Sequence, residues 1–88
     1  MAALTPDEEI DLLVDAGLLT ERQAAAYVMR EVELVPREAV AVSMGIAVST
    51  LDDYRADAIR KVEAAEATVE AVREIRYQLD GQPSQNTP

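Results

Sequence analysis

The segment from Arg37 to Tyr54 constrains the fold of this chain more than any other part of it. Within it, Ala41, Gly45 and Leu51 have the spacing of a helix-turn-helix, in which two short helices cross near a right angle. Only a small residue such as Ala41 lets the two backbones touch, and Gly45 adopts a left-handed conformation after the first helix at almost no cost. We expect Leu51 to point inward and close a small core. Such a unit normally lays its second helix in the major groove of DNA.

The composition favours one small domain and excludes several kinds of chemistry. A chain of 88 residues has a marginal core and gains stability from forming oligomers. It contains neither cysteine nor histidine, which removes disulfides, thiolate metal sites, the usual zinc ligand and the usual general base. We therefore expect no metal, no cofactor and no enzymatic activity. No apolar stretch approaches the ~20 residues of a membrane helix, and no signal peptide is evident, so we expect a soluble cytoplasmic protein.

The net charge of −9 is unusual for a DNA-binding protein, since such proteins are generally basic. The charge is uneven: residues 1–33 carry −6, residues 34–62 carry zero and residues 63–88 carry −3. The residue bias, with Lys61 as the single lysine, suggests a salt-loving source. In concentrated salt the phosphate contribution is weak for any protein, so an acidic body is less of a handicap there. An acidic protein that does not bind DNA is the alternative.

Two helices are predicted before the segment described above. Thr5 is placed to cap the first helix, Pro6 suits its first position, and Gly17 ends it. The second helix begins after Thr20, with Gln23 three residues later in the capping-box position. The sequence therefore predicts an all-α fold without a winged element.

Two more helices complete the predicted fold. The third opens with Pro36, and the fourth starts near Val48 or Ser49 with no glycine or proline until Gly81. One uninterrupted helix of that length would reach about 45 Å; a break near residue 62 is the alternative. The predicted parts are a capped helix (1–18), a helix-turn-helix domain (19–62), a C-terminal helix (63–80) and a disordered tail (81–88).

Apolar residues in the long helix are spaced like the seam of a coiled coil, in alternating steps of four and three. Arg76 takes one of the positions where an apolar residue is expected, and the adjacent Ile75 is a candidate to replace it in the seam. The predicted dimer seam consists of Ala58, Val62, Ala65, Val69, Val72 and Leu79. Because alanine buries little area, Leu12, Leu18 or Leu19 would have to add to the interface. The alternative is an amphipathic helix that folds back along its own domain.

The face of this helix opposite the inward Leu51 and Ala58 is predicted to contact DNA. The candidate base-reading residues are Val48, Ser49, Asp52, Asp53 and Ala56. The candidate phosphate contacts are Arg37, Thr50, Tyr54, Arg55, Arg60 and Lys61. Asp52 and Asp53 have an alternative structural role, because they would offset the helix dipole and partly replace the cap missing at Ala47. Tyr54 also has an alternative structural role: its ring would pack in the core, with only its hydroxyl at the surface.

Four stretches carry a family resemblance. Leu19–Gln23, Leu34–Glu38 and Met44–Leu51 are laid out as in sigma-factor region 4 and related response-regulator output domains. The continuation Arg60–Glu70 resembles the charged helix of archaeal Tfx-type transcriptional regulators. The resemblance implies a small transcription regulator that binds promoter DNA. The composition and the phrase Thr50–Asp53 together suggest a haloarchaeal member or a protein of a haloarchaeal virus or plasmid. Leu34 stands where these families usually have a turn-favouring glycine.

Two functions from different classes follow. The first is a homodimeric DNA-binding transcription regulator that presents two reading helices to half-sites about one DNA turn apart. The second is a protein-interaction module with the same fold that does not bind DNA and docks on a basic transcription-machinery protein. The net charge and the apolar Val42 on the outer surface favour the second. Enzymatic activity has no positive support.

Overall fold

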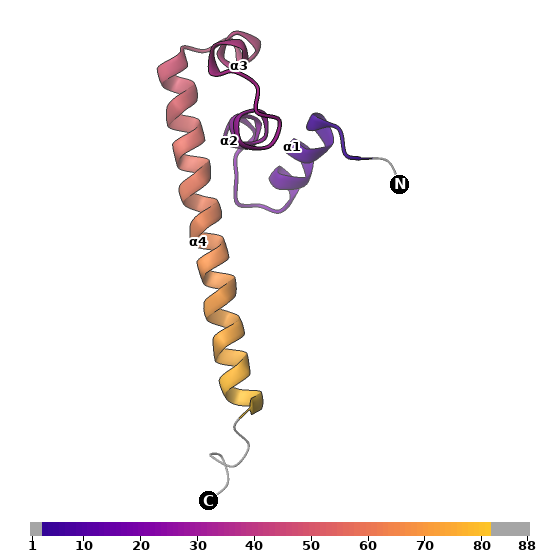
Figure 1. Cartoon of the computed structure of the whole chain (residues 1–88), viewed down its shortest axis with the longest axis vertical. Coiled ribbons are helices and arrows are strands. Elements are labelled where there is room, and N and C mark those ends of the chain that lie inside the picture. The colour runs from indigo at the N-terminus through magenta and orange to yellow at the C-terminus, as the bar shows by residue number, and fades with distance from the viewer. Residues whose placement is uncertain (1–2, 82–88) are drawn as a thin grey trace, which may run out of the picture.

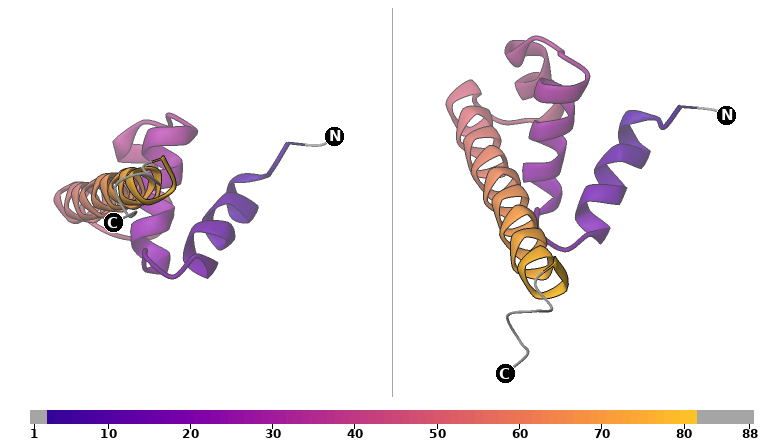
Figure 2. Two further views of the ribbon diagram at one scale, coloured as in Figure 1. Left: turned by 90° about the horizontal axis from the view of Figure 1, so that it is seen from below. Right: turned by 60° about the horizontal axis from the view of Figure 1, so that its bottom comes forward.

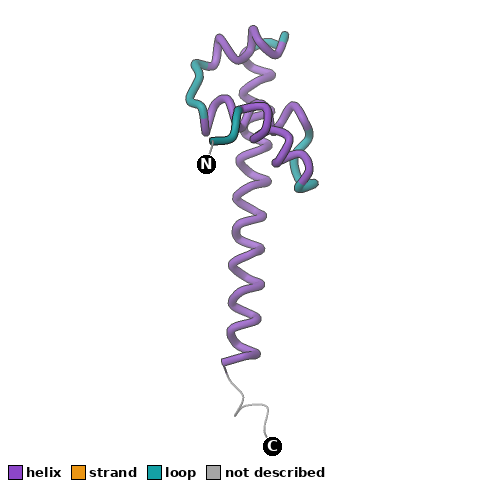
Figure 3. Tube along the Cα trace, turned by 90° about the vertical axis from the view of Figure 1, so that its right-hand side faces the viewer, coloured by secondary structure: helices purple, strands orange, loops and turns teal. Residues whose placement is uncertain are grey.

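The computed structural model describes residues 3–81. Its elements, in chain order, are α1 (Pro6–Asp15), α2 (Glu21–Tyr27), the π-helical turn η1 (Val28–Val32), α3 (Arg37–Met44) and α4 (Val48–Gly81). Residues 3–81 contain no strand, so the predicted all-α class is confirmed (Figure 3). The predicted disordered tail lies outside the described residues, except for Gly81, which ends α4.

The long helix α4 is the axis on which the other helices assemble. It runs for 34 residues without the alternative break near residue 62, so one uninterrupted helix is confirmed. The helices α1, α2 and α3 gather along its N-terminal half, with α2 between α1 and α4 (Figure 1). The C-terminal half extends away from them (Figure 2). The principal-axis extents are 64 × 34 × 19 Å.

Capping boxes begin the first two helices: the predicted cap at Thr5 and the predicted box of Thr20 and Gln23 are confirmed, and the reciprocal bond from Glu8 was not predicted. The Thr5 hydroxyl accepts from the Glu8 backbone at 3.2 Å, and the Glu8 carboxylate accepts from the Thr5 backbone at 2.8 Å. These two hydrogen bonds hold the pKa of Glu8 below its ordinary value. Thr20 and Gln23 form the same reciprocal pair at 3.2 Å each. Both helix starts are therefore fixed by local sequence, since each box satisfies two otherwise unpaired backbone donors.

The connection between α3 and α4 depends on a left-handed glycine. Gly45 has φ 69°, and its N–H donates to Val42 O at 3.1 Å. The next N–H, that of Ile46, donates to Ala41 O at 3.0 Å, which completes the Schellman arrangement that ends many helices. A β-carbon at Gly45 would meet nothing within 4 Å. Glycine is therefore needed here for its backbone angle and not for space.

A small apolar core joins α2, α3 and α4. Its buried members include Ala41 and Leu51, which are 3% and 0% exposed, together with Ala26 and Val40. Ala41 lies where α3 approaches α4, so the predicted inward orientation of Ala41 and Leu51 is confirmed. The half-buried residues around this core are Met29, Val35, Met44, Ile46, Val48 and Tyr54.

A second core joins α1 to α2 and α4. Ala24 of α2 and Ala58 of α4 are both fully buried, and Leu19 covers them. Two facing alanines let α2 and α4 approach closely, because neither carries a side chain beyond Cβ. The residues packed around this core are Ile10, Leu13, Val14, Tyr27 and Val62. Ala58 is thus covered by residues of its own chain, and its predicted place in the dimer seam is wrong.

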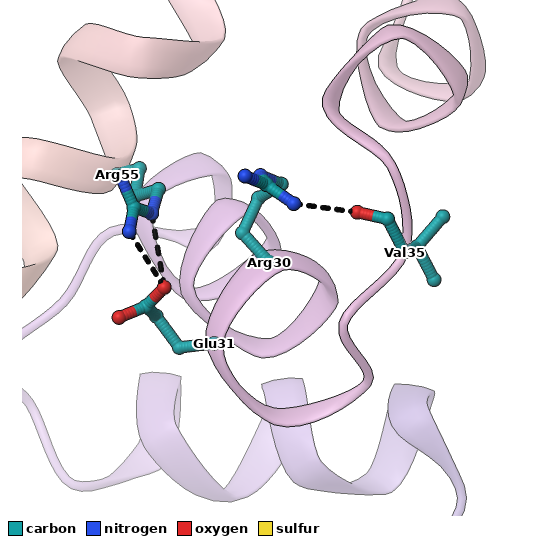
Figure 4. Close-up of polar contacts among 4 residues, drawn as sticks. All are labelled: Arg30, Glu31, Val35 and Arg55. Atoms are coloured by element: carbon teal, nitrogen blue, oxygen red, sulfur yellow. Dashed lines mark hydrogen bonds and ion pairs between the residues drawn. The ribbon is translucent and has the colours of Figure 1, made fainter.

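The loop before α3 holds a leucine in a strained conformation. Leu34 has φ 57°, in the left-handed region, although its side chain is 73% exposed. Next to it, Val35 O accepts a hydrogen bond from Arg30 Nη1 at 2.8 Å (Figure 4). Pro36 then occupies the N-cap of α3 without a side-chain cap. A left-handed conformation costs a residue with a β-carbon roughly 1–2 kcal/mol. The turn-favouring glycine of the resembling families would therefore fit at Leu34.

Replacing Leu34 with glycine should raise the free energy of unfolding by roughly 0.5 kcal/mol, because relief of strain exceeds the extra unfolded-state entropy of about 0.4–1 kcal/mol. The control is Val42→Gly, which removes an equally exposed apolar side chain from the interior of α3 and should cost about 1 kcal/mol. Urea denaturation followed by circular dichroism measures both. A comparable loss of stability in the two variants would contradict the strain at Leu34.

Two carboxyl groups meet where α1 packs against the end of η1. Glu33 raises the pKa of Glu9 above its ordinary value, chiefly because the two carboxyl groups can share a proton. Desolvation and like-charge repulsion from Glu33 act in the same direction. Oε1 of Glu9 is buried and has no hydrogen-bond partner. The ionised pair therefore opposes the docking of α1 at neutral pH.

Replacing Glu9 with glutamine should raise the melting temperature at pH 7, since an amide removes the repulsion and can donate to Glu33. The folded pKa lies above the ordinary value of 4.5, so wild-type stability falls as the pH rises through that folded pKa. The gain from the substitution should accordingly shrink as the pH is lowered toward 4.5. Thermal denaturation across this range measures it. Asp11→Asn, an exposed charge change on the same helix, is the control, and an equal gain there would assign the effect to net charge alone.

Candidate nucleic-acid interface

The first turns of α4 lie at one end of the molecule, beside α3 (Figure 1). Ser49, Asp53, Ala56 and Arg60 are exposed, and their steps of four, three and four place them along one face of the helix. Val48 is half-buried and packs against the core of Ala41 and Leu51, so less of it is available for contact than predicted. The structure thus brings most of the predicted base-reading residues onto one accessible surface.

Asp52 is held by an ion pair between α3 and α4. Its Oδ2 lies 2.6 Å from Nη2 of Arg37, and both side chains are almost half exposed. Because α4 begins at Val48, Asp52 falls in the second turn of the helix, and dipole effects fade within the first turn. The alternative role of Asp52 as a substitute cap is therefore less well supported than a link between the two helices.

The other arginines of this surface are also paired with acids of the same chain. Arg55 Nη2 lies 2.9 Å from Glu31 Oε2, which joins α4 to η1 (Figure 4). Arg60 pairs with Asp57, one turn before it on α4. Exposed pairs of this kind contribute only about 0–1 kcal/mol each, so an external anion can displace the carboxylates. The sequence analysis assigned both arginines to phosphate. The partner of Arg55 lies 24 residues away in sequence, whereas Asp57 is only three residues from Arg60.

Tyr54 and Thr50 are half-buried rather than fully exposed. Tyr54 packs against the core of Ala41 and Leu51, which agrees with the alternative prediction of a core residue. Its ring also lines an open groove between the start of α2 and the end of α3, together with Arg22 and Met44. Arg22 was not among the predicted contacts. The sequence signal that could have identified Arg22 was its position on the exposed side of the predicted second helix, near the N-terminus of that helix.

Lys61 is engaged inside the domain and does not face the surface of Ser49 and Arg60. Its Nζ donates to Gln23 Oε1 at 2.8 Å and to Leu18 O at 3.3 Å, and so ties α4 to the start of α2. The predicted phosphate contact of Lys61 is therefore replaced by a structural role. Gln23 serves both this contact and the capping box of α2.

Replacing Lys61 with methionine should lower the free energy of unfolding by roughly 1 kcal/mol, because two hydrogen bonds to a charged donor are lost. Arg60→Met is the matched control, since Arg60 is paired only with Asp57 on its own helix, and it should change stability by less than about 0.5 kcal/mol. Urea denaturation distinguishes the two variants. Equal, negligible losses would show that Lys61 does not connect α4 to α2.

The remaining seam residues divide into two groups. Val62 and Ala65 are half-buried, close to the core formed with α1 and α2. Farther along α4, Val69, Val72 and Leu79 are 47%, 37% and 63% exposed. Of the leucines predicted to support a dimer, Leu12 and Leu18 are exposed, whereas Leu19 is buried in the second core. An apolar stripe with no partner in the described chain therefore begins after Ala65.

Residues 3–81 include no group of three or more acidic side chains arranged to hold a metal ion. Within the same residues, no helix combines the length and the apolar character needed to cross a membrane. The chain matches no protein-family model, no curated protein and no solved structure. The resemblance to sigma-factor region 4 and Tfx-type regulators stays a prediction.

Proposed function

We propose that the protein is a homodimeric DNA-binding transcription regulator in which α3, the Gly45 turn and α4 act as a helix-turn-helix. The exposed face of Ser49, Asp53, Ala56 and Arg60 carries the proposal, because it projects from the second helix of this unit. In helix-turn-helix proteins this helix enters the major groove, where its N-terminal residues contact base edges.

Each residue of this face has a chemically defined contact to offer. Ser49 donates or accepts a hydrogen bond, and Asp53 accepts from the amino group of cytosine. Ala56 is small enough to lie against a thymine methyl group. Around them, Arg55 and Arg60 reach phosphates after leaving Glu31 and Asp57. The phosphates then replace the carboxylates as partners of the arginines.

A second candidate has its own supporting observations. Asp53 lies unpaired on the exposed face, and Val42 on the outside of α3 is 82% exposed. An acidic surface with an exposed apolar residue also suits a basic protein of the transcription machinery. In this alternative, the same end of the molecule docks on protein and does not bind DNA.

The test begins by selecting bound sequences from a pool of random DNA duplexes in concentrated potassium chloride. Fluorescence anisotropy with an enriched duplex then compares wild type with the double variant R55Q/R60Q. The variant should bind at least about tenfold more weakly and lower the slope of log affinity against log salt by about 2, one unit for each phosphate contact. The control is R55K/R60K, which keeps both charges and should retain most of the affinity.

Two results would contradict the regulator. One is the absence of any enriched sequence with a folded wild-type protein, and the other is equal affinity in wild type and R55Q/R60Q. Capture of a basic transcription-machinery protein by the wild type, lost in Asp53→Arg, would then support the interaction module.

A further inference from the structure

The C-terminal half of α4 cannot be explained by contacts within its own chain. After Ala65, every side chain whose burial is described, as far as Leu79, is exposed. Isolated helices of this length are marginal in water, since most helical stability in proteins comes from packing an apolar face. Val69, Val72 and Leu79 supply such a face. A helix this long therefore needs a second surface to cover its stripe.

The stripe continues into an apolar groove at the edge of the domain. Leu13 and Leu18, from α1 and the loop after it, form one wall, and Val62 and Val69 of α4 form the other. Glu66 and Arg73 of α4 also line this groove. A helix lying along the stripe would also cover the groove, so the two features form one continuous surface.

We propose that a second copy of the chain covers this surface with its own α4 running in the opposite direction. The inference rests on the homodimer of the proposed function and adds its orientation and register. With the two-fold axis between Glu70 and Ala71, Val69 packs against Val72 of the partner subunit. In the same register, Ala65 faces Arg76 of the partner subunit, and Val62 faces Leu79 of the partner subunit.

Charge favours this orientation over a parallel one. In a parallel pair, Arg76 would face Arg76 of the partner subunit within the seam, which places two like charges together. In the antiparallel pair, Arg76 lies over a small alanine, which leaves room for its long side chain. Glu66 and Arg73 flank the seam on the same side, so each lies near the opposite charge of the partner subunit.

Burial within the chain points the same way. Ala58 is fully buried in the domain's own second core, so a parallel pair would lose the first layer of its seam. The antiparallel register does not use Ala58. It also brings Tyr77 of the partner subunit, whose side chain is 69% exposed in the free chain, level with the groove beside Leu18.

The antiparallel dimer changes the geometry predicted for DNA. With a rise of about 1.5 Å per residue, the two reading faces around Asp53 lie about 53 Å apart along the helix axis. Half-sites one DNA turn apart are separated by only about 34–36 Å. The dimer is therefore expected to engage more widely spaced half-sites than the sequence alone suggested.

Electron paramagnetic resonance can measure the orientation directly, because the chain has no cysteine of its own. Ala64, Ala71 and Gln78 are exposed and seven residues apart, so they share one face of α4. Each is replaced by cysteine in a separate variant and given a nitroxide label. The antiparallel register predicts offsets along the axis of about 20, 2 and 22 Å between equivalent labels. The measured distance should therefore be shortest at Ala71 and longer at both other sites.

Equal distances at the three sites would show a parallel dimer and overturn the proposal, as would the absence of any dipolar coupling. A charge exchange provides a second measurement that does not depend on labels. Glu66→Arg should weaken dimerisation about fivefold, because two symmetric ion pairs are lost, and the double variant E66R/R73E should restore it. Failure of the double variant to recover would contradict the register. Both experiments are done without DNA, so they are independent of whether R55Q/R60Q affects DNA affinity.

Discussion

The structure depends on close helix contacts made possible by alanine. Ala24 and Ala58 allow α2 to lie against α4, and Ala26 and Ala41 do the same in the core around Leu51. Each of these contacts buries little area. In a chain without phenylalanine or tryptophan, the core therefore depends on short distances between helices rather than on large side chains. Each position would resist a larger side chain, because closely packed helices have no space to absorb it.

The local features of the fold could be predicted because each depends on a few neighbouring residues. Thr5 and Thr20 identify two helix starts through their capping boxes, and Gly45 identifies the turn before α4. Helix periodicity also separates Leu51 from the exposed face of Ser49. These properties follow from backbone hydrogen bonding and helical geometry, which require no knowledge of distant contacts.

Contacts between distant segments could not be predicted in the same way. The pattern that placed Ala58 in a dimer seam is equally compatible with packing against α2, and only the arrangement of α1, α2 and α4 in the fold decides between them. Likewise, a basic residue on the surface of α4 has the same appearance in sequence whether its partner is phosphate or Glu31. Lys61 is the most distant case, because its partners Gln23 in α2 and Leu18 in the loop after α1 lie 38 and 43 residues earlier.

The carboxylates that pair with the arginines have a consequence beyond neutralising them. Glu31 and Asp52 hold Arg55 and Arg37 in fixed positions before any ligand arrives. An arginine fixed in this way loses less conformational freedom when it transfers to another anion, whereas a random polyanion must still compete with the resident acid. In the proposed regulator, the acids would act as an internal competitor that weakens indiscriminate attachment more than attachment to a well-matched site. An acidic chain with few free cations can, by this means, favour selectivity over affinity.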